Sequence, residues 1–274
     1  MKKKYSNIRM KKHIVFIITL LFSVTIIFPG TSITIPSEDC HSISMAIIKV
    51  KSGDTIWVKD GIYKEQIKLS SGIALISLSL FKSVIDGAGN EHGIKMGNNS
   101  SLSGFEIKNA QIGVYSEGTN NIITKCFIHD NQQSGIVAVG HLPLISDNVI
   151  VENGGSGIQG WDVRSTIATI NHNTIAFNSN NGISIGGNSD IVVENNICAF
   201  NEKLGLKVEP GVKVSLLRNN FYLNAEVFSS LPSNNFTFDP MFVSATTMNY
   251  MISENSKCRN MATDNKNIGA RIIY

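Results

Sequence analysis

Residues 173–187 read NTIAFNSNNGISIGG, and the spacing inside this stretch decides the fold. The apolar Ile175 lies between Asn173 and Asn178, and a Gly-Ile pair follows four residues after the second asparagine. Asparagine is a poor strand former and a poor residue for a helix interior. Asparagines at these points therefore need a structural reason, and their recurrence along the chain supplies one.

The same spacing returns along most of the chain. Positions equivalent to Asn178 lie 22–25 residues apart, and a glycine followed by an apolar residue stands four positions after nearly all of them. The asparagines are Asn109, Asn131, Asn153, Asn178, Asn201 and Asn224, and the glycines are Gly113, Gly135, Gly157, Gly182 and Gly205. Later copies carry a second asparagine five residues earlier, at Asn148, Asn173, Asn196 and Asn219. The unit is therefore apolar-x-x-Asn-x-apolar-x-x-Asn-x-x-x-Gly-apolar.

A unit of about 22 residues cannot bury its apolar side alone and must stack on copies of itself as a solenoid. Its short segments, rich in Ile and Val and closed by Asn or Gly, are typical of strands and turns. Three strands at about 3.3 Å per residue account for one turn. We expect the corner asparagines to adopt left-handed backbone angles, which Asn tolerates. Their amides then stack inward as a hydrogen-bonded ladder.

Three apolar positions of each unit should face the interior. They form rows at Ile123, Ile145, Ile170, Val193 and Leu216; at Ile128, Ile150, Ile175, Cys198 and Phe221; and at Val114, Ile136, Ile158, Ile183 and Leu206. Cys126 also falls in an interior position, three coils and about 14 Å from Cys198, which is too far for a disulfide. We expect both to be buried free thiols.

The strongest structural alternative is a leucine-rich repeat, whose period of about 20–29 residues includes 22. Its pattern L-x-x-L-x-L-x-x-N nearly fits the stretch from Ile145 to Asn153. However, asparagine fills the second leucine position in four copies, and no apolar helical segment follows the last asparagine. The sequence therefore favours an all-β solenoid.

The N-terminal segment has the pattern of an export signal. A basic stretch ends at His13, and the apolar run IVFIITLLFSVTIIF at residues 14–28 is short for a spanning helix. We expect a signal peptide cut after Ser32, with a retained membrane anchor as the alternative. This segment carries six Lys and Arg residues and no Asp or Glu, so the rest of the chain has a net charge of −3 although the whole carries +3. Since no basic run remains, we expect no nucleic-acid partner.

The repeat and its flanks resemble the pectate-lyase-like superfamily. Residues 51–87 contain G-D-T-I-x-V, G-x-Y-x-E and I-D-G and resemble the entry segment of that superfamily. Three C-terminal stretches resemble the terminal segment of its secreted bacterial members: FDPMFV at 238–243, SKCRN at 256–260 and IGA at 268–270. The resemblance covers residues 45–272 and implies a single right-handed parallel β-helix of roughly 8–9 coils, capped at both ends. The expected organisation is a signal peptide (1–32), an N-terminal cap (33–50), the β-helix (51–228) and a C-terminal capping segment (229–274), of which residues 238–274 cover the exit.

Side chains after each Gly-apolar pair should point outward in two rows. The first row is Tyr115, Val137, Gln159, Ser184 and Lys207, and the second is Glu117, Val139, Trp161, Gly186 and Glu209. The long step from Asn153 to Asn178 places extra residues at Trp161-Asp162-Val163-Arg164. An exposed Trp beside Asp and Arg suits a sugar ring, whereas the alternative is a Trp packed over the coil edge. We predict polysaccharide binding by Tyr115, Gln159, Trp161, Asp162, Arg164, Lys207 and Glu209.

The resemblance also implies an alternative, a polysaccharide lyase or epimerase acting on polyuronates. Such a lyase needs an Arg or Lys base and acidic residues that hold Ca²⁺. Catalytic candidates are Arg164, Lys207 and Asp162, and Ca²⁺ candidates are Asp162, Asp190, Glu194 and Glu209. These residues are scattered, and the W-I-D-H and G-H-G signatures of related enzymes are absent, so the sequence requires no cofactor and defines no metal site. His129, Asp130 and Glu152 are interpreted as solvated turn residues beside the ladder.

A periplasmic copper-maturation β-helix shares this repeat and is a minor alternative. It would need a cluster of His or Met on one face. The methionines that gather are Met241, Met248, Met251 and Met261, and they lie in a non-repeat tail with aromatic neighbours that favour packing. We therefore predict a monomer that is secreted, periplasmic or held at the cell surface, binds polysaccharide, and meets a membrane only through its N-terminal segment.

Overall fold

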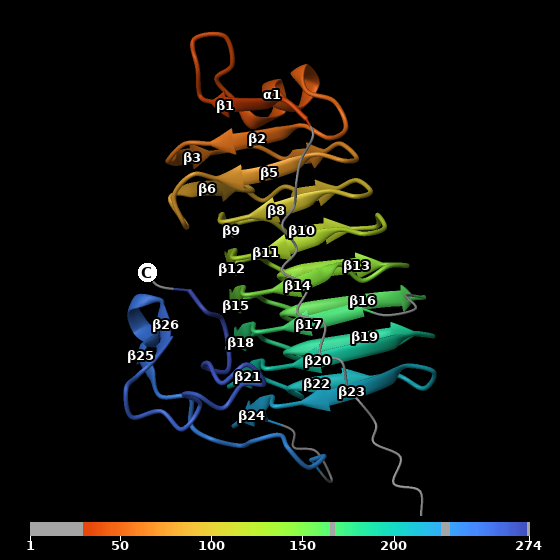
Figure 1. Cartoon of the computed structure of the whole chain (residues 1–274), viewed down its shortest axis with the longest axis vertical. Coiled ribbons are helices and arrows are strands. Elements are labelled where there is room, and N and C mark those ends of the chain that lie inside the picture. The colour runs from red at the N-terminus through yellow and green to blue at the C-terminus, as the bar shows by residue number, and fades with distance from the viewer. Residues whose placement is uncertain (1–29, 165–167, 226–230, 273–274) are drawn as a thin grey trace, which may run out of the picture.

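The computed structural model describes residues 30–164, 168–225 and 231–272. The chain winds as an all-β parallel solenoid of about eight turns, and each full turn adds one strand to each of three sheets (Figure 1). The predicted all-β fold is thereby confirmed. The signal-peptide prediction falls almost wholly outside the described residues. Thr31 and Ser32, at its end, already contact the solenoid, since the Thr31 hydroxyl donates to Asp54 and Ser32 begins the first strand.

Two of the sheets form the first and second sides of each turn. The nine-stranded sheet consists, in spatial order, of β1 (Ser32–Ile35), β2 (Thr55–Val58), β5 (Ala74–Ser77), β8 (Ser101–Ser103), β11 (Ile122–Thr124), β14 (Leu144–Ser146), β17 (Ala168–Asn171), β20 (Asp190–Glu194) and β23 (Lys213–Leu217). The eight-stranded sheet consists of β3 (Gly61–Tyr63), β6 (Ser83–Asp86), β9 (Glu106–Lys108), β12 (Phe127–His129), β15 (Val149–Val151), β18 (Thr174–Ala176), β21 (Ile197–Ala199) and β24 (Asn220–Tyr222).

The third side of each turn is a seven-stranded sheet. Its strands are β4 (Ile67–Leu69), β7 (His92–Met96), β10 (Ile112–Ser116), β13 (Ile136–Val139), β16 (Ile158–Val163), β19 (Ile183–Gly187) and β22 (Leu206–Val208). A separate antiparallel pair, β25 (Phe242–Ser244) and β26 (Asn249–Ile252), belongs to the C-terminal segment.

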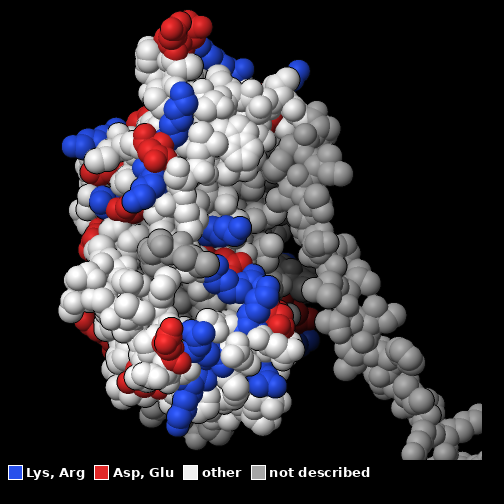
Figure 2. All heavy atoms as spheres, turned by 60° about the vertical axis from the view of Figure 1, so that its left-hand side comes forward, with Lys and Arg blue, Asp and Glu red and all other residues white. Residues whose placement is uncertain are grey.

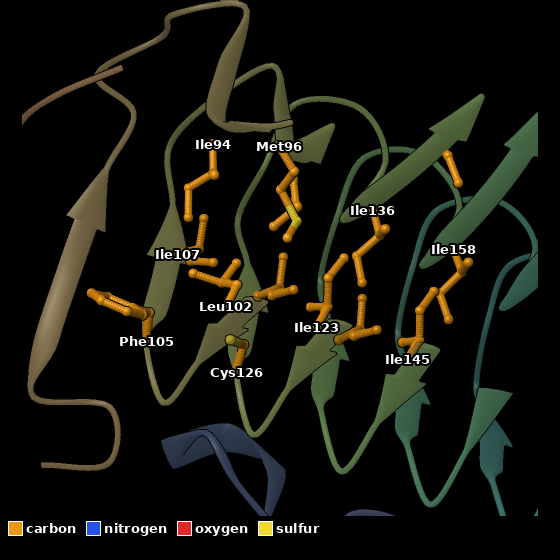
Figure 3. Packing of buried hydrophobic residues seen from close by; sticks show 14 of the residues in the cluster. Ile94, Met96, Leu102, Phe105, Ile107, Ile123, Cys126, Ile136, Ile145 and Ile158 are labelled. Carbon is orange, nitrogen blue, oxygen red and sulfur yellow. The ribbon is translucent and has the colours of Figure 1, made fainter. Parts of the chain in front are cut away.

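The interior is filled by the apolar rows that the repeat predicts. Ile123 pairs in register with Ile145, and Ile136 pairs with Ile158, so identical positions of successive turns lie over one another. Figure 3 shows these four side chains pointing into the space that the sheets enclose, and all four are fully buried. Each such isoleucine contributes about 1.5–3 kcal/mol by leaving water.

Two asparagine ladders run along the corners of the solenoid, one on each side of the eight-stranded sheet. In each ladder the side-chain amide of one turn donates to the side-chain carbonyl of the next at 2.9–3.1 Å. The first ladder is Asn131, Asn153, Asn178, Asn201 and Asn224, and the second is Asn148, Asn173, Asn196, Asn219 and Asn235. The predicted inward column of amides is confirmed.

The backbone at the ladder differs from the prediction in two ways. The left-handed angle falls on the residue before each ladder asparagine, as at Phe177 (φ 56°), and not on the asparagine itself. In addition, Asn109 is not the first rung, because the N–H that donates to Asn131 belongs to Ala110. Asparagine is therefore retained at these corners for its amide, which satisfies buried backbone groups, and not for its tolerance of the turn.

Helices play a small part in the described residues, which contain α1 (Ile43–Lys49) and the single 3₁₀ turn η1 (Ala245–Thr247). Neither belongs to the repeat, so the leucine-rich alternative is wrong. The α1 helix closes the N-terminal end (Figure 1) by burying Ile43 and Ala46, and the Glu65 carboxylate accepts the Ile43 N–H at its start. In the part of the chain that the structure describes, no helix is long and apolar enough to cross a membrane.

The C-terminal segment lies in a different place from the one predicted. Residues 238–272 do not cover the open end; they fold back along the outer face of the eight-stranded sheet (Figure 1). Tyr250 of β26 packs there with Phe127 and Val149, and the Ala270 N–H donates to the Thr174 hydroxyl. The reason is that this face carries apolar outward side chains, Val149 and Val151 among them, which need cover.

All four cysteines are free and buried. Burial raises the pKa of Cys126 to about 12 and that of Cys258 to about 11, and it raises the pKa of Cys198 as well. The prediction that Cys126 and Cys198 are buried free thiols is confirmed. Thiols of this kind are inert toward metals and oxidants, since the thiolate is the reactive form.

Candidate functional site

The predicted outward row exists on the seven-stranded sheet. Tyr115, Val137, Gln159, Ser184 and Lys207 pair in register from β10 to β22. They are not equally open to solvent, however: Val137 and Ser184 are 1% and 7% exposed, whereas Lys207 is exposed. Neighbouring side chains stand only about 4.8 Å apart along such a row, so long ones shield the short ones between them.

Trp161 is a large apolar side chain that is exposed on this face. It pairs in register with Val139, and the regular pairing of β16 with β19 then shifts between Gly160 and Val163, as in a β-bulge. Bulges re-aim side chains next to functional sites. The indole is 51% exposed, so the alternative of a Trp buried as packing over the coil edge is not what the structure adopts.

Trp161 and Tyr115 line one groove of about 480 Å³ on the outer face of the seven-stranded sheet. Its other walls include Lys68 of β4, Lys95 of β7 and the amide side chain of Gln133. The two lysines extend the outward row toward the N-terminus, because Lys68 pairs with Lys95 and Lys95 pairs with Tyr115. A groove of this size falls within the range of natural ligand sites. We refer to it as the sheet groove.

Among the described residues the groove is lined by one carboxylate, Glu91, and its lysine Lys95 forms an ion pair with Glu117 beside the groove. Lys95 Nζ lies 2.7 Å from Oε1 of Glu117 and 5.2 Å from the centre of the Tyr115 ring. The hydrogen bond between Lys95 and Glu117 raises the pKa of the lysine and lowers that of the carboxyl. The His92 ring packs against Tyr115 with ring centres 4.6 Å apart and the planes tilted by 41°, and burial lowers the pKa of that histidine. Lys68, by contrast, makes no ion pair among the described residues.

The groove lysines are not among the residues predicted from the sequence, although the sequence carries a signal for Lys95. Gly93-Ile94-Lys95 has the same Gly-apolar-outward pattern as the later copies. The ladder pattern does not reveal it, because Gly89 stands where the ladder asparagine would be, four residues before Gly93. The ladder marks the middle and C-terminal coils, whereas the outward row begins earlier.

The remaining predicted site residues do not join this groove. Asp162 and Arg164 form an exposed ion pair of 2.7 Å at the end of β16. Lys207 lies four strands from Tyr115, at the last strand of the sheet. Glu209 reaches back over Gly186, whose added Cβ would lie 2.5 Å from its carboxylate.

The predicted Ca²⁺ ligands are equally dispersed. Asp190 and Glu194 stand at opposite ends of β20, which belongs to the nine-stranded sheet and not to the seven-stranded one. Asp162 is engaged by Arg164, and Asp190 faces Lys213 at 3.9 Å. Across residues 30–164, 168–225 and 231–272, no three His, Cys, Asp or Glu side chains are grouped so that they could hold a metal ion. These four carboxylates therefore do not fit a shared calcium site.

The interpretation of His129 as a solvated turn residue is wrong, whereas Asp130 and Glu152 are exposed residues with left-handed backbone angles directly before ladder asparagines, as predicted. His129 is 2% exposed, and its two ring nitrogens lie 2.7 Å from Asp130 and 3.2 Å from Glu106. Burial opposes ionisation of Glu106, but hydrogen bonds from His129 and Lys108 outweigh it and lower the pKa of this carboxyl. Glu152 accepts a hydrogen bond from the Tyr250 hydroxyl. His129 is thus buried in the eight-stranded sheet, whereas Glu152 is an exposed residue that bonds the covering segment at the surface.

Comparison with known proteins agrees with this architecture. The family model described as "Right handed beta helix region" matches residues 66–221, more than half of the chain. The chain belongs to this family. The predicted right-handed parallel β-helix is thus confirmed for residues 66–221, which carry the sheet groove and most of both ladders.

Two solved structures show what the fold is similar to. Pectate lyase Pel9A aligns with a TM-score of 0.55 and 15% identity over 84% of this chain and 90% of its own. The mannuronan C-5 epimerase AlgE4 A-module of Azotobacter vinelandii aligns with a TM-score of 0.44 and 16% identity over 66% of this chain and 72% of its own. A search of the curated proteins found no sequence match. At these identities the likeness to the lyase concerns the β-helix fold alone.

Proposed function

We propose that this β-helix binds a polysaccharide along the outer face of its seven-stranded sheet, with the sheet groove as the main contact. The observation that carries the proposal is the exposed Trp161 lining the same groove as Tyr115 and two lysines. Aromatic faces stack on the apolar faces of sugar rings, while lysine and amide groups bind hydroxyl and carboxylate groups. The protein is proposed to be exported and to act outside the cytoplasm as a monomer.

The ligand is proposed to be an extended chain carrying some negative charge. The outward row runs over seven strands from Lys68 to Lys207, a span of about 29 Å at the parallel-strand spacing. A straight row of this length suits a linear polymer better than a single sugar. Two of the outward positions at the N-terminal end are lysines, which favours an acidic polymer such as a polyuronate.

The test is binding of the pure protein to a glycan array and to soluble pectate and alginate, with the Trp161→Ala variant beside the wild type. The variant should bind about fivefold more weakly or worse, because it loses the stacking surface. Ile62→Ala is the matched control, since Ile62 is 68% exposed on β3 of another sheet. Unchanged binding by Trp161→Ala would remove the proposed site.

The same samples test the alternative of a polyuronate lyase or epimerase. A rise in ultraviolet absorbance from unsaturated products, with or without added Ca²⁺, would establish a lyase, and a change in uronate stereochemistry measured by NMR would establish an epimerase. Binding without either product supports a non-catalytic module, the function that the dispersed Arg164, Lys207 and Asp162 favour.

A further inference from the structure

A second cavity lies on another side of the molecule, between the eight-stranded sheet and the C-terminal segment that covers it. Its volume is about 410 Å³, and its floor includes Thr174 of β18. One wall is β26 with Tyr250, and the other is formed by residues 265–272. None of the residues that line the sheet groove lines this cavity, so the two are separate.

Positive charge and amide groups dominate the rim of this cavity. Arg259, Lys266 and Arg271 line it together with Asn260 and Asn265, and no Asp or Glu is among its described lining residues. Figure 2, which brings this side of the molecule forward, shows Lys and Arg side chains grouped on it, with Asp and Glu side chains among them.

The three cations differ in how they are engaged. Arg271 forms ion pairs with Asp147 at 2.7 Å and with Asp264 at 3.1 Å, and these hold its side chain in the cavity wall. Arg259 and Lys266 make no ion pair with any residue that the structure describes. Asp264 lies near enough to Lys266 for that charge to lower the pKa of its carboxyl, but it forms its ion pair with Arg271. Two exposed cations thus line one cavity without an ion pair of their own among the described residues, so a bound anion could pair with both.

The backbone around the cavity is held in place by its own hydrogen bonds. The Asn260 N–H donates to the Asn267 side chain at 3.3 Å, and the Ile268 N–H donates to the Cys258 carbonyl at 2.9 Å. The Gly269 N–H donates to the Asn195 carbonyl at 2.8 Å, which ties this loop to the β-helix. A cavity whose walls are fixed in this way needs little ordering when a ligand enters.

We propose that this cavity binds a small organic anion about the size of one sugar ring, through a carboxylate or phosphate group held by Arg259 and Lys266. Guanidinium and ammonium groups form the strongest hydrogen bonds with these oxyanions. The asparagine side chains supply donors and acceptors for hydroxyl groups, and the partly apolar wall from Tyr250 to Ile252 takes the ring face. The site is independent of polysaccharide binding in the sheet groove.

Isothermal titration of the full chain tests the proposal with four probes: galacturonate, glucose 6-phosphate, inorganic phosphate and uncharged glucose. The first two should bind in the millimolar range or tighter, inorganic phosphate more weakly, and glucose not measurably. A preference for galacturonate or for glucose 6-phosphate distinguishes a carboxylate ligand from a phosphate ligand. Absence of binding by both organic anions would overturn the proposal.

Variants then locate the binding site. Arg259→Ala and Lys266→Ala should each weaken binding about tenfold, since each removes a charged hydrogen-bond donor, and Lys266→Arg should keep most of it. Both side chains are exposed, so the fold should survive, as circular dichroism can verify. Lys203→Gln removes an exposed charge elsewhere and should change nothing. Lys68→Gln alters only the sheet groove, so an equal loss in that variant would place the anion there and refute the second site.

Discussion

Arg271 donates from Nε and Nη2 to the two carboxylate oxygens of Asp147, each at 2.7 Å, and so joins residues 124 positions apart. The Asp147 side chain is only 10% exposed, and its partner is 34% exposed. Arg271→Ala should therefore lower the free energy of unfolding by about 1–3 kcal/mol, because it leaves a nearly buried carboxylate without its cation. Urea unfolding followed by circular dichroism measures this change.

The chain contains a matched control for this ion pair. Arg164 and Asp162 form a pair of the same length, 2.7 Å, with both side chains more than 60% exposed. Arg164→Ala should change stability by less than about 1 kcal/mol, as exposed ion pairs do. Equal losses in the two variants would mean that burial of Asp147 is not what gives its pair its strength.

The asparagine ladder predicts a larger loss of stability when one of its buried amides is removed. The Asn178 amide donates to Asn201 and to the Ile150 carbonyl, and its carbonyl oxygen accepts from Asn153. Asn178→Ala leaves buried donors and acceptors on both neighbouring turns without partners, each costing about 1–3 kcal/mol. We expect the urea midpoint to fall accordingly. The exposed Asn188 is the control, and Asn188→Ala should leave the midpoint almost unchanged.

The repeated glycines make a separate prediction about close packing. A Cβ on Gly157 would lie 2.4 Å from Ile175 Cγ2 and 2.8 Å from the Gly182 carbonyl oxygen, so the next turn must move. Gly157→Ala should cost about 1–3 kcal/mol by overpacking. Gly140 is glycine for another reason: its φ is +74° and nothing lies within 4 Å of an added Cβ. Gly140→Asn should therefore destabilise the protein less than Gly140→Ala, because asparagine tolerates positive φ. Gly157→Asn should destabilise it more than Gly157→Ala, because the larger side chain overpacks further. Denaturant unfolding of these four variants distinguishes backbone strain from overpacking.

His172 should make the stability of the folded protein depend on pH. Burial, followed by the nearby charge of Arg271, lowers its pKa below the ordinary 6.5, although Asp147 and Asp264 act in the opposite direction. Near pH 6 the unfolded chain then binds more protons than the folded one, so stability falls as the pH drops below about 6.5. His172→Gln should make this fall shallower. Part of it should remain because burial also lowers the pKa of His92. Urea unfolding between about pH 7.5 and about pH 5 checks the slope, and an unchanged slope would contradict the role of His172.

The repeat made the interior predictable, because a fixed period determines which side chains share a row. Asn178 and Ile175 could be placed for that reason alone, and so could the outward position of Trp161. The C-terminal segment could not be placed, since it has no period and its contacts, such as Arg271 with Asp147, connect distant parts of the chain. The burial of His129 could not be predicted either. Its ring lies against the ring of Phe127, with centres 4.2 Å apart, and the repeat pattern does not encode this contact.

The ion pair at the sheet groove leads to a prediction about selectivity. Glu117 neutralises Lys95 at 2.7 Å, while Lys68 makes no ion pair among the described residues. If the groove binds an acidic polysaccharide, Glu117→Gln should strengthen binding a few-fold, because it frees Lys95 for the ligand. Lys95→Gln should weaken binding more than Lys68→Gln, since it also leaves the Glu117 carboxylate to repel the polymer.

Titration of pectate at two salt concentrations measures these changes, because pairing between exposed charges weakens as salt screens them. The difference between Glu117→Gln and wild type should shrink at high salt, whereas the loss caused by Trp161→Ala should persist, since stacking does not depend on charge. A neutral polysaccharide that binds the protein should respond to Trp161→Ala alone. Weaker pectate binding by Glu117→Gln would show that the carboxylate positions Lys95 for the ligand and does not compete for it.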